Sequence, residues 1–177
     1  MALSPHPAAS TLDDLFSATY EELRRLAAHV GRGDAAATLN PTALVNEAYL
    51  KLAGSLRITP ESRLHFKRLA ARAMRQVLIE AARRRNAARR GGGVAMVTFD
   101  EALDAADASS GELLALDAAL RDFAGINPRQ AMVVELRFFG GFTQAETAQA
   151  LEISEATVDR DWRSARAWLA RELRRAG

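Results

Sequence analysis

The stretch from Phe142 to Arg175 constrains the fold of this chain most, because two helix starts lie in it at a short, fixed spacing. Thr143 and Glu146 have the spacing of a capping box, in which a hydroxyl and a carboxylate bond each other's backbone N–H groups at a helix start. Ser154 is suited to cap a second helix, and Glu155 in its first turn faces the positive end of the helix dipole. The two starts predict a helix-turn-helix.

The second of these helices has two opposed faces. At about 100° per residue, a sector of roughly 80° holds the apolar or small residues Val158, Trp162, Ala165, Leu169 and Leu173. The opposite side holds Ala156, Arg160, Arg163, Ala167, Arg171 and Arg174. Such a helix fits the major groove of DNA, with its first residues near base edges and its arginines near phosphates or guanine. The candidate DNA contacts of this motif are Thr143, Ser154, Glu155, Ala156, Thr157, Arg160, Arg163, Ser164 and Arg171. The alternative is an ordinary amphipathic helix with a solvated charged face.

Charge is distributed in blocks although the net charge is only +2. Residues 57–90 contain 11 Lys and Arg residues against two acids, whereas residues 91–125 contain seven acids against one arginine. This pattern indicates two basic modules separated by an acidic connector. Arginines make up 22 of the 24 basic residues, and arginine favours bidentate contacts to phosphate and guanine. A bias in genomic base composition could produce the same excess.

The first helices are predicted from caps and apolar periodicity. Thr11 and Asp14 form a second capping box, and glycines at 31 and 33 are expected to end the helix that follows. Asn40 before Pro41 starts the next helix, as cap and first-turn proline. Its apolar face is Leu44, Val45, Ala48 and Leu52, which leaves Asn46, Glu47 and Lys51 on the outside. A plain polar surface is the alternative interpretation of those three residues.

A loop at residues 54–62 and a long helix follow. The helix is expected to begin at Thr59-Pro60 and to run to about Arg90, before three glycines. Its arginines, Arg68, Arg72, Arg75 and Arg83, share a sector of about 80° opposite the apolar residues. We predict that this stripe, with Arg57, Thr59 and Ser62 of the loop, attracts nucleic acid and holds unpaired DNA. The alternatives are a solvated face and a stripe that binds only closed duplex.

The remaining segments complete an all-α fold of two small helical domains. Residues 1–10 are assigned as a disordered N-terminus, 11–90 as the first domain, 91–111 as a flexible acidic linker and 112–177 as the second domain. Two further helices are predicted in the second domain, one from Glu112 and one from Asn127-Pro128 to Gly140.

No catalytic or metal-binding arrangement is evident. The chain has no cysteine, and its three histidines lack metal-ligand spacing. No run of 18 or more apolar residues or signal-like N-terminus occurs. We therefore expect a soluble cytoplasmic protein that is not an enzyme, needs no cofactor or metal and does not insert into membranes.

Three segments together resemble the extracytoplasmic-function (ECF) sigma factors of bacterial RNA polymerase. They are NPTALVNEAYLKL at 40–52, HFKRLAARAMRQVLIEAARRR at 65–85 and NPRQAMVVELRFFGGFTQAETAQALEISEATVDRDWRSARAWL at 127–169. The resemblance implies two helical domains, called sigma regions two and four. It implies that Asn46, Glu47 and Lys51 dock on core RNA polymerase, that residues 54–90 recognise and melt the minus-ten promoter element, and that the helix-turn-helix recognises the minus-thirty-five element. An anti-sigma factor is a further candidate partner.

Two residues depart from the family pattern. Glu152 stands in the interhelical turn where the family usually has glycine, so either the turn avoids a left-handed backbone or Glu152 is strained. Asp159 stands where many relatives have a basic residue beside the DNA, and it would repel phosphate unless it pairs with Arg163.

The alternative function is a stand-alone helix-turn-helix transcriptional regulator that binds closed duplex and never joins polymerase. It accounts for residues 142–175 alone and gives no reason for a second basic module. A pure interaction protein, such as an inhibitor that binds sigma factors, would explain the helices but not two opposed arginine faces.

Overall fold

The computed structural model describes residues 11–30, 40–55, 60–88 and 110–176, and every regular element in these ranges is helical. The elements are α1 (Leu12–Val30), α2 (Pro41–Ala53), α3 (Arg63–Ala88), α5 (Ser110–Ile126), α6 (Pro128–Val134), the π-helix η1 (Glu135–Phe139), α7 (Gln144–Leu151) and α8 (Glu155–Ala176). The predicted all-α fold is confirmed. The predicted N-terminal tail and nearly all of the predicted linker lie outside the described residues. Within the described ranges, no helix is long and apolar enough to cross a membrane.

The predicted helix caps in the N-terminal part are present. The Thr11 N–H donates to Asp14 over 3.0 Å, and the Asp14 N–H donates to the Thr11 hydroxyl over 3.1 Å. At α2, the Asn40 side chain accepts from the N–H of Ala43 over 2.8 Å, with Pro41 in the first turn. Each cap satisfies backbone donors that a helix start leaves without an intrahelical partner. Local sequence alone therefore predicted both helix starts.

Two predicted helix starts were displaced by a few residues. The long helix α3 begins at Arg63 and not at Thr59-Pro60, because the Ser62 hydroxyl caps it by accepting from the His65 N–H over 3.1 Å. Helix α5 begins at Ser110 and not at Glu112, so the last two residues of the predicted linker are helical. Ser110 is buried, and its hydroxyl accepts a 2.9 Å hydrogen bond from Nε of Arg85 in α3. A contact with a distant helix thus stabilises the first turn of α5.

The helix predicted between Asn127 and Gly140 is divided. It starts at Pro128 as expected, although the Asn127 side chain forms no capping bond, and it widens into η1 at Glu135. The wider turn lets the Gly140 N–H bond the carbonyl of Glu135 over 3.2 Å. A π-helical turn inside a helix is uncommon, and residue periodicity did not indicate it.

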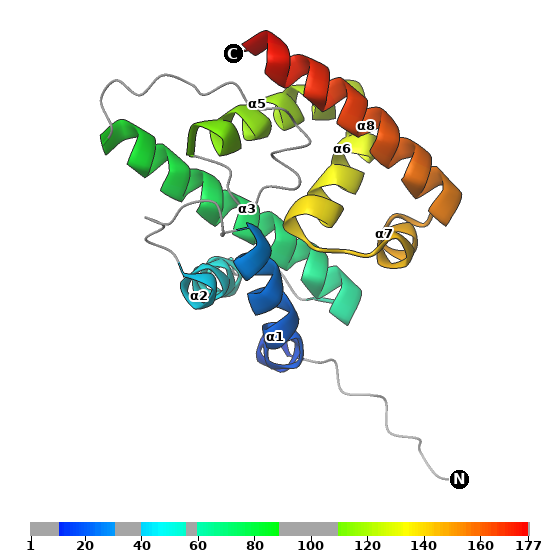
Figure 1. The fold of residues 1–177 in the computed structure, drawn as a ribbon. Coiled ribbons are helices and arrows are strands. Elements are labelled where there is room, and N and C mark those ends of the chain that lie inside the picture. Colours follow the sequence, from blue (N-terminus) through cyan, green and yellow to red (C-terminus); the bar gives the residue numbers. More distant parts are fainter. Residues whose placement is uncertain (1–10, 31–39, 56–59, 89–109, 177) are drawn as a thin grey trace.

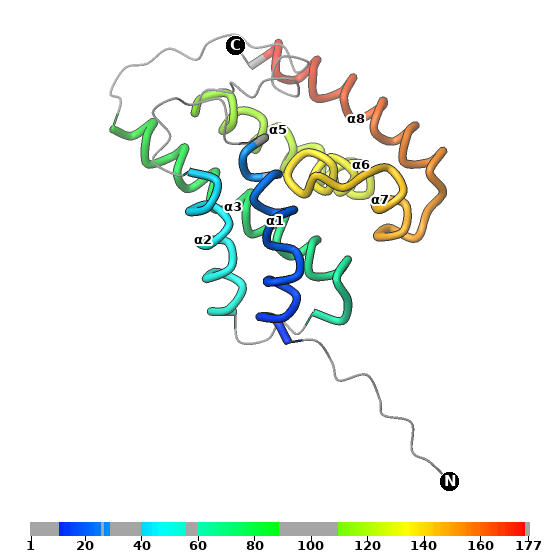
Figure 2. The backbone as a smooth tube through the Cα atoms, turned by 60° about the horizontal axis from the view of Figure 1, so that its bottom comes forward, coloured from blue at the N-terminus to red at the C-terminus, as the bar shows by residue number. Residues whose placement is uncertain are grey.

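The helices are arranged around α3, which crosses the middle of the molecule. Figures 1 and 2 show α1 and α2 on one side of it and the helices that follow residue 110 on the other. We refer to α1–α3 as the N-terminal part and to α5–α8 as the C-terminal part. One continuous hydrophobic core joins them, with Phe66 and Met74 of α3 in the same cluster as Leu116, Phe123 and Leu169. The division of the chain into two domains stays a prediction, because α3 packs against both parts.

Candidate nucleic-acid interface

The start of α7 has the capping box that the sequence predicted. The Thr143 N–H donates to the Glu146 carboxylate over 2.9 Å, and the Glu146 N–H donates to the Thr143 hydroxyl over 3.1 Å. Helix α8 is capped by Ser154, whose hydroxyl accepts from the Thr157 N–H over 3.1 Å. The side chain of Gln144 donates to the backbone carbonyl of Glu155 over 3.0 Å and so ties the two helix starts together. The helix-turn-helix predicted from these residues is present.

The turn between α7 and α8 contains a left-handed residue. Glu152 has φ 54° and ψ 43°, and it is the only residue other than glycine with positive φ in the described ranges. The next N–H, of Ile153, bonds the carbonyl of Ala148 over 3.0 Å, as expected where a left-handed residue ends a helix. The sequence left open whether the turn avoids this conformation. It does not, so Glu152 carries the strain that glycine would avoid.

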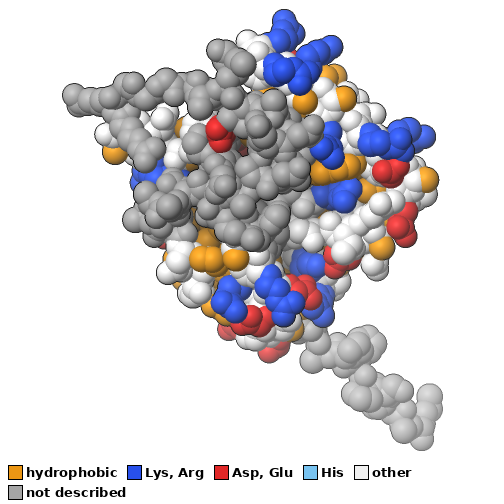
Figure 3. Space-filling view, viewed as in Figure 1, with side chains coloured by type: hydrophobic (Ala, Val, Ile, Leu, Met, Phe, Trp, Pro, Cys, Tyr) orange, Lys and Arg blue, Asp and Glu red, His pale blue; other side chains and the backbone are white. Residues whose placement is uncertain are grey.

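Helix α8 buries the predicted apolar stripe. Val158, Ala165 and Leu169 are fully buried, and the partly buried residues Trp162 and Leu173 pack against the core. Its opposite face is exposed along its length at Ala156, Arg160, Arg163, Ala167, Arg171 and Arg174. Basic side chains stand out along the edge of the molecule that α8 forms (Figure 3). The two faces therefore lie where the sequence placed them.

The remaining candidate contacts of the motif lie at or near the surface of the helix-turn-helix. Thr143, Ser154, Glu155 and Ser164 are exposed, and Thr157 is half-buried. Asp159 pairs with Arg163 one turn further along the helix. This pairing neutralises the carboxylate that would otherwise face phosphate, and it also occupies one of the arginines.

Asp161 is a buried acidic residue of α8 that sequence analysis missed. Its side chain accepts bonds from Arg129 over 2.7 and 3.1 Å and from Gln130 over 3.3 Å. The hydrogen bond and the charge of Asp161 raise the pKa of Arg129. These contacts hold α8 against the start of α6 and so fix the angle at which the arginine face is presented. The sequence did indicate that Asp161 could be buried, because a rotation of about 100° per residue places position 161 next to the apolar stripe of α8.

The outer face of α2 carries the three residues assigned to polymerase docking. Asn46 and Glu47 are exposed, whereas Lys51 is only partly exposed because its ammonium pairs with Glu80 of α3 over 2.9 Å. The same helix exposes Leu50 at 66% of its surface, a residue that sequence analysis did not select. The face is thus polar with one apolar side chain at the surface.

The arginine stripe of α3 is divided between solvent and the C-terminal part. Arg72 and Arg83 are exposed. Arg75 is 15% exposed and pairs with Asp117 of α5 and Glu135 of η1. Arg68 donates to the backbone carbonyl of Ala150 in α7 over 3.1 Å. The four arginines therefore do not form one exposed surface, because Arg68 and Arg75 contact the C-terminal part.

The loop residues predicted to act with this stripe are only partly described. Ser62 is exposed and serves as the cap of α3. Arg57 and Thr59 lie outside the described residues.

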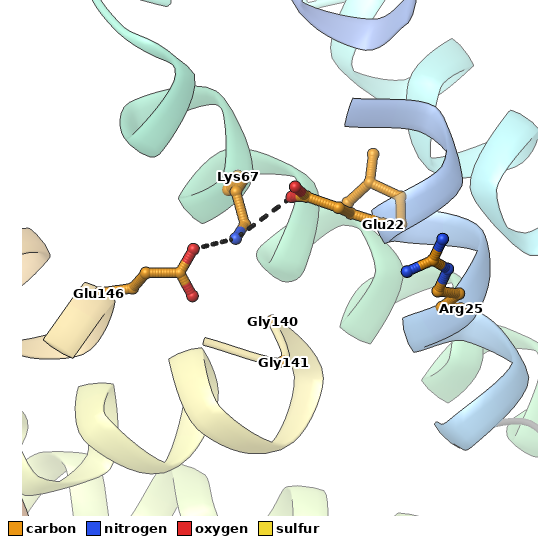
Figure 4. Close-up of a pocket in the computed structure, with 7 residues that line it drawn as sticks. Glu22, Arg25, Lys67, Gly140, Gly141 and Glu146 are labelled. Carbon is orange, nitrogen blue, oxygen red and sulfur yellow. Dashed lines mark hydrogen bonds and ion pairs between the residues drawn. The ribbon is translucent and has the colours of Figure 1, made fainter. Parts of the chain in front are cut away.

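Lys67 of α3 is a buried cation between the two parts. Its ammonium lies 2.6 Å from Glu146 of α7 and 3.4 Å from Glu22 of α1 (Figure 4). The ammonium also lies over the Phe142 ring, 4.9 Å from its centroid. Burial acts to raise the pKa of Glu146, but hydrogen bonds from Lys67 and Thr143 outweigh it and the pKa is lowered. Glu146 thus caps α7 and binds α3 at once, a double role that its spacing from Thr143 alone could not reveal.

Within the part of the chain that the structure describes, no three His, Asp or Glu side chains are grouped so as to hold a metal ion. A protein-family model described as ECF sigma factor matches residues 7–175. No curated protein and no solved structure matches the chain in the corresponding searches.

Proposed function

The chain belongs to the ECF sigma factor family, which gives it a role in transcription initiation, and from this we propose which partner each of its three candidate surfaces binds. The α8 face recognises the upstream, minus-thirty-five promoter element in closed duplex. The α3 stripe captures the opened minus-ten strand. The outer face of α2 docks on the coiled coil of the largest subunit of core RNA polymerase. The observation that carries the proposal is the exposed arginine face of α8, the second helix of a helix-turn-helix whose two helix starts are both capped. The same chain contains a second basic helix, α3.

Upstream recognition is supported by the placement of Arg160 and Arg163. Both are exposed opposite the stripe that anchors α8, so contact with a major groove would not disturb the core, although Arg163 would have to exchange or share its ion pair with Asp159. Arginine suits this task because its planar guanidinium binds guanine or phosphate through two parallel hydrogen bonds. Asp159 beside Arg163 limits the approach of the backbone phosphate at that position.

We predict that changing Arg160 or Arg163 to alanine weakens binding to the upstream element by about 1 to 3 kcal/mol and relaxes base preference at one position. Arg175→Ala is the matched control, since it removes the same charge from an exposed site off this face, where Arg175 forms only a 3.8 Å pair with Glu172. Affinity is measured by fluorescence anisotropy on promoter duplexes, with helicity followed by circular dichroism. Equal affinity for both variants and the control would refute the assignment of this face.

Polymerase docking is supported by the exposure of Asn46, Glu47 and Leu50 on one helix, all away from the hydrophobic core. We predict that Glu47→Lys weakens binding to core polymerase without lowering the melting temperature of the free chain, because the side chain is exposed and the structure gives it no partner in the described ranges. Asp122→Lys, an exposed acid of α5, is the matched charge reversal. If Glu47→Lys binds core polymerase as tightly as Asp122→Lys does, docking uses another face.

A stand-alone regulator would share the α8 face but not the dependence on polymerase. Transcription from a promoter library by purified bacterial core polymerase, with and without the chain, separates the two functions. The proposal requires selective initiation that appears only when the chain is added. Duplex binding without any initiation would favour the regulator.

A further inference from the structure

An acidic residue, Asp159, lies at the edge of the arginine face of α8. Its carboxylate accepts a hydrogen bond from Nη2 of Arg163, one turn further along the helix, and the two side chains form an ion pair. The side chain of Asp159 is 44% exposed and that of Arg163 is 73% exposed. An ion pair this exposed contributes little to the stability of a fold. Its position on the candidate DNA face therefore matters more than its contribution to folding.

The charge of Asp159 also acts on a second arginine, Arg137 of η1. Arg137 lies over the Trp162 ring, 4.5 Å from the ring centroid, and Trp162 packs against the hydrophobic core. Burial lowers the pKa of Arg137, and the charge of Asp159 opposes this effect, whereas the charge of Arg166 adds to it. Asp159 thus interacts with one arginine that is held against the core and with one, Arg163, that extends into solvent.

The ion pair leaves most donors of Arg163 available to a ligand. A guanidinium has five N–H groups, and the bond to Asp159 uses one of the two on Nη2. The other N–H of Nη2 and those of Nη1 can still donate to two acceptors side by side. Guanine presents such a pair, N7 and O6, in the major groove, and arginine is its commonest specific partner. Holding the guanidinium in place beforehand reduces the conformational entropy lost on binding.

The same carboxylate disfavours a phosphate as the ligand of Arg163. A phosphate beside Arg163 would approach the negative charge of Asp159, whereas a guanine base carries no charge. Arg160 provides a contrast on the same face, because the residues four positions before and after it are Ala156 and Ser164, and neither is acidic. Asp159 therefore favours a base edge over the DNA backbone at Arg163, and no equivalent pairing affects Arg160.

We propose that Asp159 is a specificity-determining residue that positions Arg163 to bind a guanine in the upstream promoter duplex. This inference rests on the proposed role of α8. Without Asp159, the Arg163 side chain can also reach neighbouring phosphates, so its preference for guanine weakens. Removing an acid from the DNA face strengthens the general attraction to DNA at the same time. Total affinity and base preference are therefore expected to change in opposite directions.

Base preference is measured by binding the full chain to a duplex library with a randomised upstream segment and sequencing the bound fraction. The unaltered chain is expected to prefer guanine at one position by roughly 5- to 100-fold, as for a bidentate base contact. Arg163→Ala and Arg163→Lys should lose this preference, because lysine lacks the planar fork of donors. Asp159→Asn should reduce the preference about fivefold, near the upper limit for an exposed ion pair, while total duplex affinity rises.

Two controls separate positioning from general charge effects. Glu152→Gln neutralises another exposed acid, in the turn before α8, and should leave the guanine preference unchanged. The second control replaces the preferred guanine by 7-deazaguanine, which lacks the N7 acceptor. This replacement should weaken binding of the unaltered chain and have no effect on Arg163→Ala.

A measurement without DNA tests the pairing itself. Nuclear magnetic resonance relaxation of the guanidinium N–H groups reports their motion on the picosecond to nanosecond timescale. Asp159→Asn is expected to increase the motion of the Arg163 guanidinium and to leave that of Arg160 unchanged. Equal Arg163 motion with and without the Asp159 carboxylate would overturn the inference.

An unchanged guanine preference in both Asp159→Asn and Asp159→Ala, with helicity retained, would overturn the inference and leave the role of α8 intact. A cytosine preference that disappears with Asp159, while the guanine preference of Arg163 persists, would also overturn it, because Asp159 would then accept from the base directly. If the unaltered chain selects no upstream sequence, the proposed role of α8 fails. The motion of Arg163 then decides by itself whether Asp159 positions this side chain.

Discussion

Glu152 adopts a backbone conformation that its side chain disfavours. At φ 54° the Cβ atom of an L-residue lies too close to the neighbouring carbonyl, which costs roughly 1 to 2 kcal/mol, whereas glycine has no Cβ. Glycine also loses more backbone entropy on folding, and this offsets part of the gain. We therefore predict that Glu152→Gly raises the free energy of unfolding by about 0.5 to 1 kcal/mol.

Urea denaturation followed by circular dichroism measures the effect of Glu152→Gly. Gln149→Gly is the control, because Gln149 is an exposed residue inside α7, where glycine should cost about 1 kcal/mol. Stabilisation at 152 together with destabilisation at 149 is the expected pair of results. Destabilisation at both positions would mean that the left-handed turn is not strained by Glu152.

At the residue scale, the sequence predicts what depends on near neighbours. Thr143, Ser154 and Asn40 were identified as caps because each bonds a backbone group three residues away. Lys67 and Asp161 were missed because their partners lie on other helices, 79 residues away for Glu146 and 32 for Arg129. Their burial follows from how helices pack, which no local spacing specifies.

At the scale of elements, the turn after η1 packs closely against α3 at Gly140. A Cβ atom at Gly140 would lie 2.5 Å from the Leu136 carbonyl oxygen, 2.8 Å from Cδ2 of Phe142 and 2.9 Å from the Cβ of Ala71. Backbone and buried atoms cannot yield by that much without displacing the turn. We predict that Gly140→Ala destabilises the chain by about 1 to 3 kcal/mol, the usual cost of overpacking.

Gly125→Ala is the matched control for Gly140→Ala. Added at Gly125, a Cβ meets no atom within 4 Å, so alanine there should leave stability unchanged or slightly increased. Thermal unfolding of both variants provides the comparison. Equal melting temperatures would show that the η1 turn is free to move away from α3.

Helix periodicity predicted the arginine face and the apolar stripe of α8 but not the buried Asp161, and it predicted the faces of α3 only in part. In both helices it identified which residues enter the core, such as Leu169 and Phe66. It could not say what lies against the polar face, because a charged stripe is compatible with solvent, nucleic acid or an acidic neighbour. For α8 the neighbour is solvent, and for Arg75 in α3 it is Asp117 and Glu135.

At the scale of the whole molecule, the chain combines two candidate DNA-binding surfaces that differ in exposure. The arginine face of the helix-turn-helix is exposed, whereas Arg68 and Arg75 of the α3 stripe are bonded to the C-terminal part. The sequence indicated two basic modules and an acidic connector, but the acids found on α3 are Asp117, Glu135 and Glu146. Only the first of these lies in the acidic block, so charge distribution along the chain did not predict which carboxylates would bind the basic residues of α3.

Permanganate footprinting of promoter DNA with core polymerase tests the central claim most directly, because permanganate modifies unpaired thymines. We predict minus-ten reactivity that requires the chain and that falls when Arg72 and Arg75 are both changed to alanine, since their proposed contacts with the strand offset part of the cost of opening the duplex. The double variant Arg24→Ala with Arg84→Ala removes the same charge from exposed positions outside the stripe and should retain reactivity. Full minus-ten reactivity in the Arg72 and Arg75 variant would contradict the account, because the opened strand would then be held elsewhere in the complex.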